Sequence, residues 1–290
     1  MERVIGRVTN TMTRRAALTA HGVIGLIACI ATASVVTGII TGSPTAQIDA
    51  AITAWIFIAA ILASICGFAF GPIAGAGLVA TGLSPVAMVG LVVVCSITIQ
   101  SYGLVALHSA MEWRRALPFA AGGLLTVPFG VAILQVVPMS TFQITLGTIL
   151  VAYASFALMP FKMRSIRASR SGDFVTGALG GLVGGLSGFP SAPIVIWCGL
   201  QGLSKTFQRG ICQPYILTMQ LATVAWMQRG FDFSGIERQL ILAMPVALLA
   251  ATLGVGVFRK LSNAAFSRVV NVLLMAAGIV LIARPVLAMV

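Results

Sequence analysis

The stretch GALGGLVGGLSGFPSAP, from Gly177 to Pro193, contains six glycines and two prolines in 17 residues of an otherwise apolar segment. Within a helix, a glycine costs about 1 kcal/mol relative to alanine, and an interior proline costs about 3 kcal/mol. A second stretch, CGFAFGPIAGAG from Cys66 to Gly77, has the same character. Because helix-weakening residues are concentrated at these two places, we predict that two helices are interrupted there for a functional reason.

The composition indicates an integral membrane protein. Of the 290 residues, 59% are hydrophobic and only 8% are charged, which is far from the usage of soluble globular proteins. We therefore predict an all-α, polytopic membrane fold, with almost no chain left for a soluble domain. At about 1.5 Å per residue, the uninterrupted apolar stretches long enough to cross a bilayer are 21–41, 84–107, 116–137, 140–160, 206–227, 238–257 and 264–283.

The polar residues argue against several other kinds of protein. All six acidic residues lie between or at the ends of apolar stretches, so the membrane interior is predicted to lack carboxylates. The formal charge of +12 comes from lysines and arginines spread over short loops, and without a continuous basic stripe we expect no nucleic-acid partner. The five cysteines lie in apolar stretches without a CxxC spacing, so neither a metal nor a cofactor is predicted.

The distribution of basic residues predicts how the two interrupted regions, 50–83 and 174–203, are placed in the membrane. If each region crosses once, the 18 lysines and arginines divide equally between the two sides. If each region enters and returns to its own side, through arms of about 11 to 15 residues, 15 of the 18 lie in the cytoplasm. The positive-inside rule favours the second arrangement. We predict seven crossings, two re-entrant hairpins and a cytoplasmic N-terminus in a cell inner membrane.

The two interrupted regions are related by an internal repeat. Gly67 and Pro72 recur as Gly188 and Pro193 at an offset of 121, and Gln100 recurs as Gln220 at an offset of 120. Each unit holds one hairpin and three crossings, an odd number, so the second unit is predicted to be inverted, as in many secondary transporters. The predicted organisation is a basic tail and extra helix at 1–49, repeats at 50–160 and 174–290, and a cytoplasmic connector at 161–173.

These features resemble the sulfite exporter TauE/SafE family of membrane proteins over residues 50–285. The resemblance rests on the glycine-rich start of each half, on the segments TGLSPVAMVG and QGLSKTFQRG that follow, and on the basic loop between the halves. It implies a duplicated, multi-helix permease that exports sulfite, sulfoacetate or a related organosulfur anion.

The helix breaks themselves suggest how an anion is bound. Proline is well tolerated at the first position of a helix, where its missing N–H would have no partner, so Pro72 and Pro193 are predicted to begin the second arm of each hairpin. A helix start presents unbonded N–H groups and a partial positive charge, which together attract an anion. An alternative is that Gly67, Gly71 and Gly75, and Gly177, Gly181 and Gly185, serve helix packing. The candidate substrate-binding residues at the breaks are Gly67, Phe68, Gly71, Pro72, Ser187, Gly188, Phe189 and Ser191.

Polar side chains within the crossings complete the candidate site. Gln100, Gln213 and Gln220 are added because polar groups inside a membrane usually face a cavity or a partner. Gln100 and Gln220 are expected to lie near the two ends of the substrate path through the protein. Alternatively, each amide is expected to bond a neighbouring helix. Arg209, near the cytoplasmic edge, is a candidate for attracting anions to the entrance, although such an arginine more often extends to the lipid head groups.

The sequence therefore predicts an alternating-access permease that exports a small sulfur-containing anion and is not an enzyme. No nucleophile with a neighbouring base is present, and no sequence GxxxxGK[ST] is available for ATP. Its expected partners are the substrate anion and the lipid bilayer, with a homo-oligomer possible. The alternatives are an importer of thiosulfate or another oxyanion and a membrane assembly factor that transports nothing.

Overall fold

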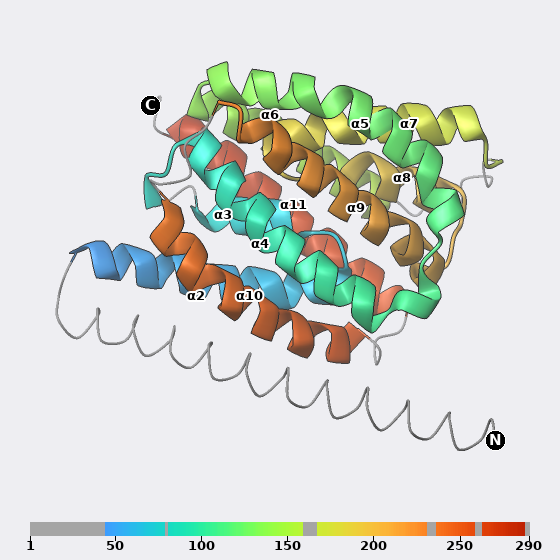
Figure 1. Ribbon diagram of the computed structural model, residues 1–290, viewed down its shortest axis with the longest axis horizontal. Helices are drawn as coiled ribbons and strands as arrows, with labels where there is room; N and C mark the ends of the chain where they lie inside the picture. Colours follow the sequence, from blue (N-terminus) through green and yellow to red (C-terminus); the bar gives the residue numbers. More distant parts are fainter. Residues whose placement is uncertain (1–43, 79–80, 159–166, 231–235, 259–262, 288–290) are drawn as a thin grey trace.

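The computed structural model (Figure 1) describes residues 44–78, 81–158, 167–230, 236–258 and 263–287. Within these ranges the regular structure is helical throughout and no strand is formed. The all-α prediction is confirmed. The predicted extra helix at 21–41 and the connector residues 161–166 lie outside the described residues.

The same order of helix lengths occurs twice along the chain. Each half has a long helix, a helix of nine residues and three further long helices. The first half contains α2 (Pro44–Cys66), α3 (Phe70–Leu78), α4 (Pro85–Ala106), the short η2 (His108–Ala110), α5 (Trp113–Val136) and α6 (Met139–Leu158). The second half contains α7 (Arg170–Ser187), α8 (Ala192–Leu200), α9 (Lys205–Met227), α10 (Glu237–Phe258) and α11 (Asn263–Leu287).

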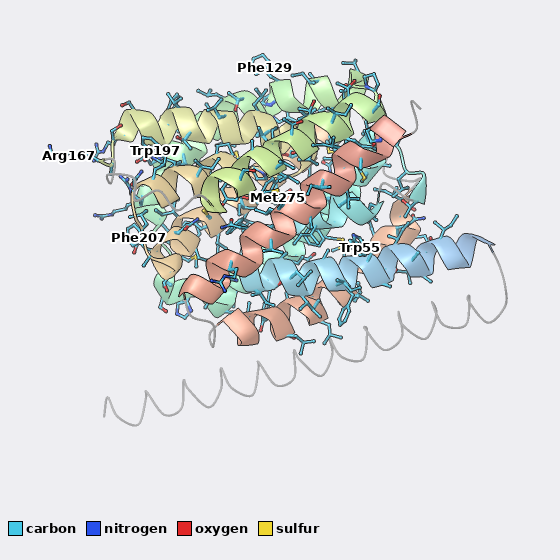
Figure 2. All side chains as sticks on the ribbon, turned by 180° about the vertical axis from the view of Figure 1, so that it is seen from behind. Trp55, Phe129, Arg167, Trp197, Phe207 and Met275 are labelled. Atoms are coloured by element: carbon cyan, nitrogen blue, oxygen red, sulfur yellow. The ribbon has the colours of Figure 1, made fainter. Side chains whose placement is uncertain are left out.

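Four of the described helices are long and apolar enough to cross a membrane. These candidate spans are Ile48–Ile65, Pro85–Ala106, Trp113–Val136 and Glu237–Gly256. Large apolar side chains also cover the outside of the molecule, and Figure 2 shows Phe129 of α5 at the periphery, where it is 65% exposed. Such a surface is stable in contact with lipid rather than with water. The count of seven crossings remains a prediction.

The predicted arms of about 11 to 15 residues are wrong, because the two arms of each interrupted region differ greatly in length. Helix α2 has 23 residues and α7 has 18, whereas α3 and α8 have nine each. We expected the long arms to start after Asp49 and Asp173, which are charged. Both aspartates instead lie inside their helices, and both are paired with arginines, so the helices continue through them.

The helix ends of the two halves use the same capping residues. Four glycines adopt a left-handed backbone conformation, in two pairs that are 121 and 120 residues apart: Gly67 with Gly188, and Gly82 with Gly202. The serine two positions after each of the second pair caps the following helix. Ser84 accepts a hydrogen bond from the N–H of Ala87, and Ser204 from that of Phe207. These local signals place the starts of α4 and α9.

The two halves are interlocked rather than side by side. Helix α5 of the first half packs along α7 of the second, as Figure 1 shows, and α10 of the second half packs along α2 of the first. A Cβ atom on Gly177, Gly181 or Gly185 would collide with the α5 backbone, so these glycines permit close helix packing. Around the Cβ position of Gly75, in contrast, no atom from another described part of the chain lies within 4 Å.

Two pairs of corresponding helices, α4 with α9 and α6 with α11, run in opposite directions. Gln213 of α9 bonds Gln100 of α4, whereas Gln220, further along α9, bonds Ser96, which lies earlier in α4. The two helices are therefore antiparallel. Helices α6 and α11 behave in the same way, since Gly147 lies against Ile282 and Val151 lies against Gly278. The segments that begin α2 and α7 consequently lie at opposite ends of the long axis in Figure 1.

Candidate functional site

The two helix breaks meet inside the molecule. Helix α2 is followed by Gly67 and α7 by Gly188, and each glycine has a positive φ angle that residues with a side chain rarely adopt. The Ser191 hydroxyl of the second break donates a hydrogen bond of 3.2 Å to the Phe68 carbonyl of the first. A Cβ atom on Gly71 would lie 2.9 Å from the Gly188 carbonyl oxygen. We call the contact region of residues 67–72 and 188–193 the junction.

The two prolines that we expected to begin each second arm lie in its first turn, but not at its first position. Pro72 is the third residue of α3, and Pro193 is the second residue of α8, which follows Ser191 as N-cap. Within the first turn a proline leaves the helix intact, because the N–H groups there have no partner in the helix. The remaining first-turn N–H groups of α3 and α8 are directed toward the junction end of each helix.

Gln100 and Gln220 occupy corresponding places in the junction. The amide nitrogen of Gln100 donates to the Gly67 carbonyl at 3.4 Å, and that of Gln220 donates to the Gly188 carbonyl at 3.1 Å. The last carbonyls of a helix lack a partner within the helix, so each glutamine completes the break of its own half. The structure thus places both amides at the junction, bonded to neighbouring backbone.

Arg209 lies deep in the protein, beside the first break. Its side chain is buried, with a relative exposure of 5%. Its Nε donates to Gln213 Oε1 at 3.2 Å, and its Nη2 donates to the Ser64 carbonyl at 3.1 Å. A Cβ atom on Gly67 would lie 3.0 Å from Arg209 Nε, so the glycine makes room for the guanidinium group. The side chain does not extend to the surface of the described structure.

Gln213 connects the arginine to the rest of the junction. While its oxygen accepts from Arg209, its amide nitrogen donates to the Gln100 carbonyl at 3.4 Å. Arg209 and Gln213 are four residues apart and therefore lie on one face of α9. That spacing is visible in the sequence and could have indicated the pairing, although not its position beside Gly67.

The serine hydroxyls at the junction make different kinds of hydrogen bond. Ser187 donates to the Val183 carbonyl in its own helix and accepts from the Phe189 N–H, a local pattern common for helical serines. Ser96 lies opposite Gln220, whose amide nitrogen reaches its hydroxyl at 3.2 Å. The aromatic rings of Phe68 and Phe189 are also buried at the junction and help to exclude water from it.

The junction has the electrostatic character of an anion site. Two helix starts contribute partial positive charge, and Arg209 contributes a full charge. In such a low-dielectric interior each contribution acts more strongly than in water. Among the described residues, no group of three or more His, Cys, Asp or Glu is placed to hold a metal ion.

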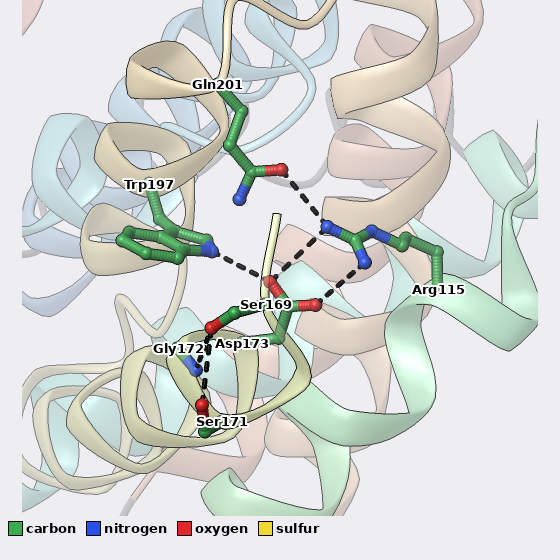
Figure 3. A network of polar contacts seen from close by, with 7 residues as sticks. All are labelled: Arg115, Ser169, Ser171, Gly172, Asp173, Trp197 and Gln201. Atoms are coloured by element: carbon green, nitrogen blue, oxygen red, sulfur yellow. Dashed lines mark hydrogen bonds and ion pairs between the residues drawn. The ribbon is translucent and has the colours of Figure 1, made fainter. Parts of the chain in front are cut away.

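A second polar cluster, which the sequence analysis did not identify, joins the halves at the start of α7 (Figure 3). Asp173 is fully buried and forms an ion pair of 3.0 Å with Arg115 of α5. Trp197 Nε1 donates to the same carboxylate at 2.7 Å, and Arg115 also donates to Gln201 at 3.1 Å. The cluster ties the long and short arms of the second break to the first half.

A corresponding ion pair lies at the start of α2. Asp49 pairs with Arg238 of α10 at 2.8 Å and accepts from Gln239 at 3.0 Å. Each pair joins a long arm to the other half, and the two pairs lie at opposite ends of the molecule, where α2 and α7 begin. Arg238 is 63% exposed whereas Arg115 is 26% exposed. The Arg115–Asp173 pair is therefore the better shielded from water.

Comparison with known proteins agrees with this architecture. The family model described as "Sulfite exporter TauE/SafE" matches residues 52–281. A curated relative, the probable sulfite/organosulfonate exporter TauE of Cupriavidus necator, is 30% identical over 152 residues, which are 50% of this chain and 58% of the relative. The chain thus spans less than two thirds of that relative's length.

No solved structure matches the chain. The family match covers both helix breaks, most of α2, all helices from α3 to α10 and most of α11. Together with the candidate membrane spans, this match shows a multi-pass membrane protein of a transporter family. The chain belongs to the sulfite exporter TauE/SafE family.

Proposed function

We propose that the protein is a permease that exports a small sulfur-containing anion, such as sulfite or an organosulfonate, and that the junction is its binding site. The observation that carries the proposal is the meeting of two helix breaks beside the buried Arg209. Backbone N–H groups and one guanidinium group suit an oxyanion. The description of the family and the name of the relative support the choice of sulfite or a sulfonate.

The two halves, 50–160 and 174–290 with the connector 161–173 between them, form an inverted repeat in this proposal. The opposite directions of α4 and α9, and of α6 and α11, support it. The charge distribution supports a cytoplasmic N-terminus in an inner membrane. If so, a cysteine introduced at Ser171 reacts with an impermeant reagent only from the cytoplasmic side, and reaction from the periplasmic side contradicts the orientation.

Transport would proceed by alternating access. Among the described residues, the ion pairs between the halves lie at the outer ends of the long arms, Arg115–Asp173 for α7 and Arg238–Asp49 for α2. Opening one end while the other stays paired would expose the junction to one side at a time. At an inside-negative potential, each negative charge that leaves gains about 2.3 kcal/mol per 100 mV, so export needs no further coupling.

The function is tested with purified protein in liposomes. Labelled sulfite, sulfonates, thiosulfate and sulfate are supplied under an imposed potential, and their flux in both directions is measured. We expect flux of sulfite or a sulfonate that follows the potential. Transport of thiosulfate alone would favour the importer, and absence of flux from correctly folded protein would favour an assembly factor.

Arg209 is expected to be needed for anion binding rather than for folding alone. Arg209→Gln removes the charge, and we expect the apparent KM for sulfite to rise by on the order of a hundredfold, which corresponds to the loss of a charge-assisted hydrogen bond. Arg209→Lys keeps the charge, but an ammonium group lacks the planar set of N–H donors with which the guanidinium group bonds Gln213 and Ser64. We therefore expect an apparent KM between those of the wild type and of Arg209→Gln. Equal KM values for the Gln and Lys variants would contradict this role.

A further inference from the structure

One buried acceptor at the junction has no hydrogen-bond partner among the described residues. This atom is Oε1 of Gln220, whose residue is 2% exposed. The amide nitrogen of the same side chain is fully used, since it donates to the Gly188 carbonyl at 3.1 Å and reaches the Ser96 hydroxyl at 3.2 Å. A buried acceptor without a donor is unfavourable, so a ligand group that donates a proton would be stabilised at this atom.

The orientation of the Gln220 amide follows from its neighbours. The Gly188 carbonyl can only accept a hydrogen bond, so the amide nitrogen must face it. Turning the amide over would place Oε1 against that carbonyl, with two acceptors in contact and no proton between them. The side-chain oxygen therefore stays on the opposite side of the amide, as an acceptor.

The other polar side chains of the junction do not supply a donor to this oxygen in the contacts that they make. The Ser191 hydroxyl donates to the Phe68 carbonyl. The Gln100 amide nitrogen donates to Gly67, and that of Gln213 donates to the Gln100 carbonyl. The starts of α3 and α8 and the Arg209 guanidinium group add donors for a ligand, whereas Gln220 Oε1 adds an acceptor.

We infer that the junction binds its oxyanion as a monoanion that carries one O–H group, and that this group donates to Gln220 Oε1. The inference deepens the proposed function and rests on it. Among sulfur anions, hydrogensulfite has this chemistry: its ionised oxygens suit the helix starts and Arg209, and its O–H suits the glutamine. A sulfite dianion would bring an acceptor oxygen against Oε1 and leave both without a proton.

A site that has an unpaired acceptor for a ligand hydroxyl discriminates strongly against an analogue that lacks the hydroxyl. The unsatisfied acceptor lowers the affinity for the analogue by on the order of tenfold to a hundredfold. Methanesulfinate is a matched analogue of hydrogensulfite, because it has the same charge and a methyl group in place of the hydroxyl. A sulfonate with a hydroxyl group elsewhere, such as 2-hydroxyethanesulfonate, would satisfy the same acceptor and has ethanesulfonate as its analogue.

The experiment measures equilibrium binding of these four anions to the purified full chain in detergent, at slightly acidic pH. We expect hydrogensulfite to bind on the order of tenfold or more tightly than methanesulfinate. Discrimination only between 2-hydroxyethanesulfonate and ethanesulfonate would identify a hydroxysulfonate as the source of the O–H. Equal binding within both pairs overturns the inference and leaves the proposed function intact, whereas no binding of any sulfur anion would contradict the proposed function itself.

A pH series and one pair of variants assign the effect to Gln220. The affinity for total sulfite should fall as pH rises from slightly acidic to alkaline and hydrogensulfite is lost, while that for methanesulfinate stays constant. Gln220→Met should bring the ratio of the two affinities close to one. Gln100→Met, the corresponding change in the first half, should keep the ratio. A ratio unchanged in Gln220→Met overturns the assignment, and the wild-type comparisons remain decisive if that variant does not fold.

Discussion

Replacement of Gly71 by alanine is expected to reduce anion flux by on the order of a hundredfold, which corresponds to the cost of overpacking at a rigid contact. The added Cβ atom would lie 2.9 Å from the Gly188 carbonyl oxygen and 3.1 Å from the Phe189 Cβ atom. Both neighbours belong to the second break, so the two breaks would be forced apart. Flux into liposomes measures the effect.

Gly75 provides a matched control in the same short helix. Among the described residues, no atom outside its own helix lies within 4 Å of its Cβ position, so Gly75→Ala adds a methyl group without a collision there and slightly favours the helix. We expect near-normal flux from this variant, and the same membrane insertion and yield from both. If Gly71→Ala transports as well as Gly75→Ala, the close contact of the two breaks has no role in transport.

Replacement of Arg115 by leucine is expected to lower the free energy of unfolding by about 3 kcal/mol. Asp173 is fully buried, and removal of its arginine leaves a charge in the interior with hydrogen bonds from Trp197 alone among the contacts described above. Denaturant titration in detergent measures the loss. Arg238→Leu, at the corresponding pair, should cost less, about 1 kcal/mol. Asp49 is also buried, but it keeps the hydrogen bond from Gln239, and water already screens its pair with the mostly exposed Arg238.

The double variant Arg115→Leu with Asp173→Asn separates charge from packing. The asparagine is neutral and can still accept from Trp197, so most of the lost stability should return. If the double variant is as unstable as Arg115→Leu alone, the penalty does not come from an uncompensated carboxylate. Equal losses for Arg115→Leu and Arg238→Leu would likewise contradict the role of burial.

The sequence predicted those parts of the fold that depend on local energetics. Glycine and proline are costly in a helix wherever it lies, so the breaks near Gly67 and Gly188 could be located without a structure. The lengths of the helical arms on either side of each break could not be predicted in this way. The apolar regions 50–83 and 174–203 begin directly after Asp49 and Asp173, whereas the helices continue through both residues, because the arginine partners that neutralise them lie far away in the chain.

The candidate site was predicted in its composition but not in its contacts. The offset of 120 residues indicated that Gln100 and Gln220 correspond, yet nothing local indicated that each bonds the carbonyl of a left-handed glycine. Arg209 was expected near an edge because it lies at the start of an apolar stretch, where an arginine usually extends to the lipid head groups. Its burial depends on Gly67 leaving space and on Gln213 and Ser64 supplying oxygens, and only the tertiary structure brings these together.

The central claim, that the two helix breaks together bind the anion, is tested most directly by locating a bound anion. Selenite has the shape of sulfite and contains a strong anomalous scatterer, so crystals grown with it give its position without a model of the ligand. We expect an anomalous peak at the junction, within hydrogen-bonding distance of the first-turn N–H groups of α3 or α8 and near Gln220. A peak elsewhere in a transport-competent protein, with none at the junction, would contradict the claim.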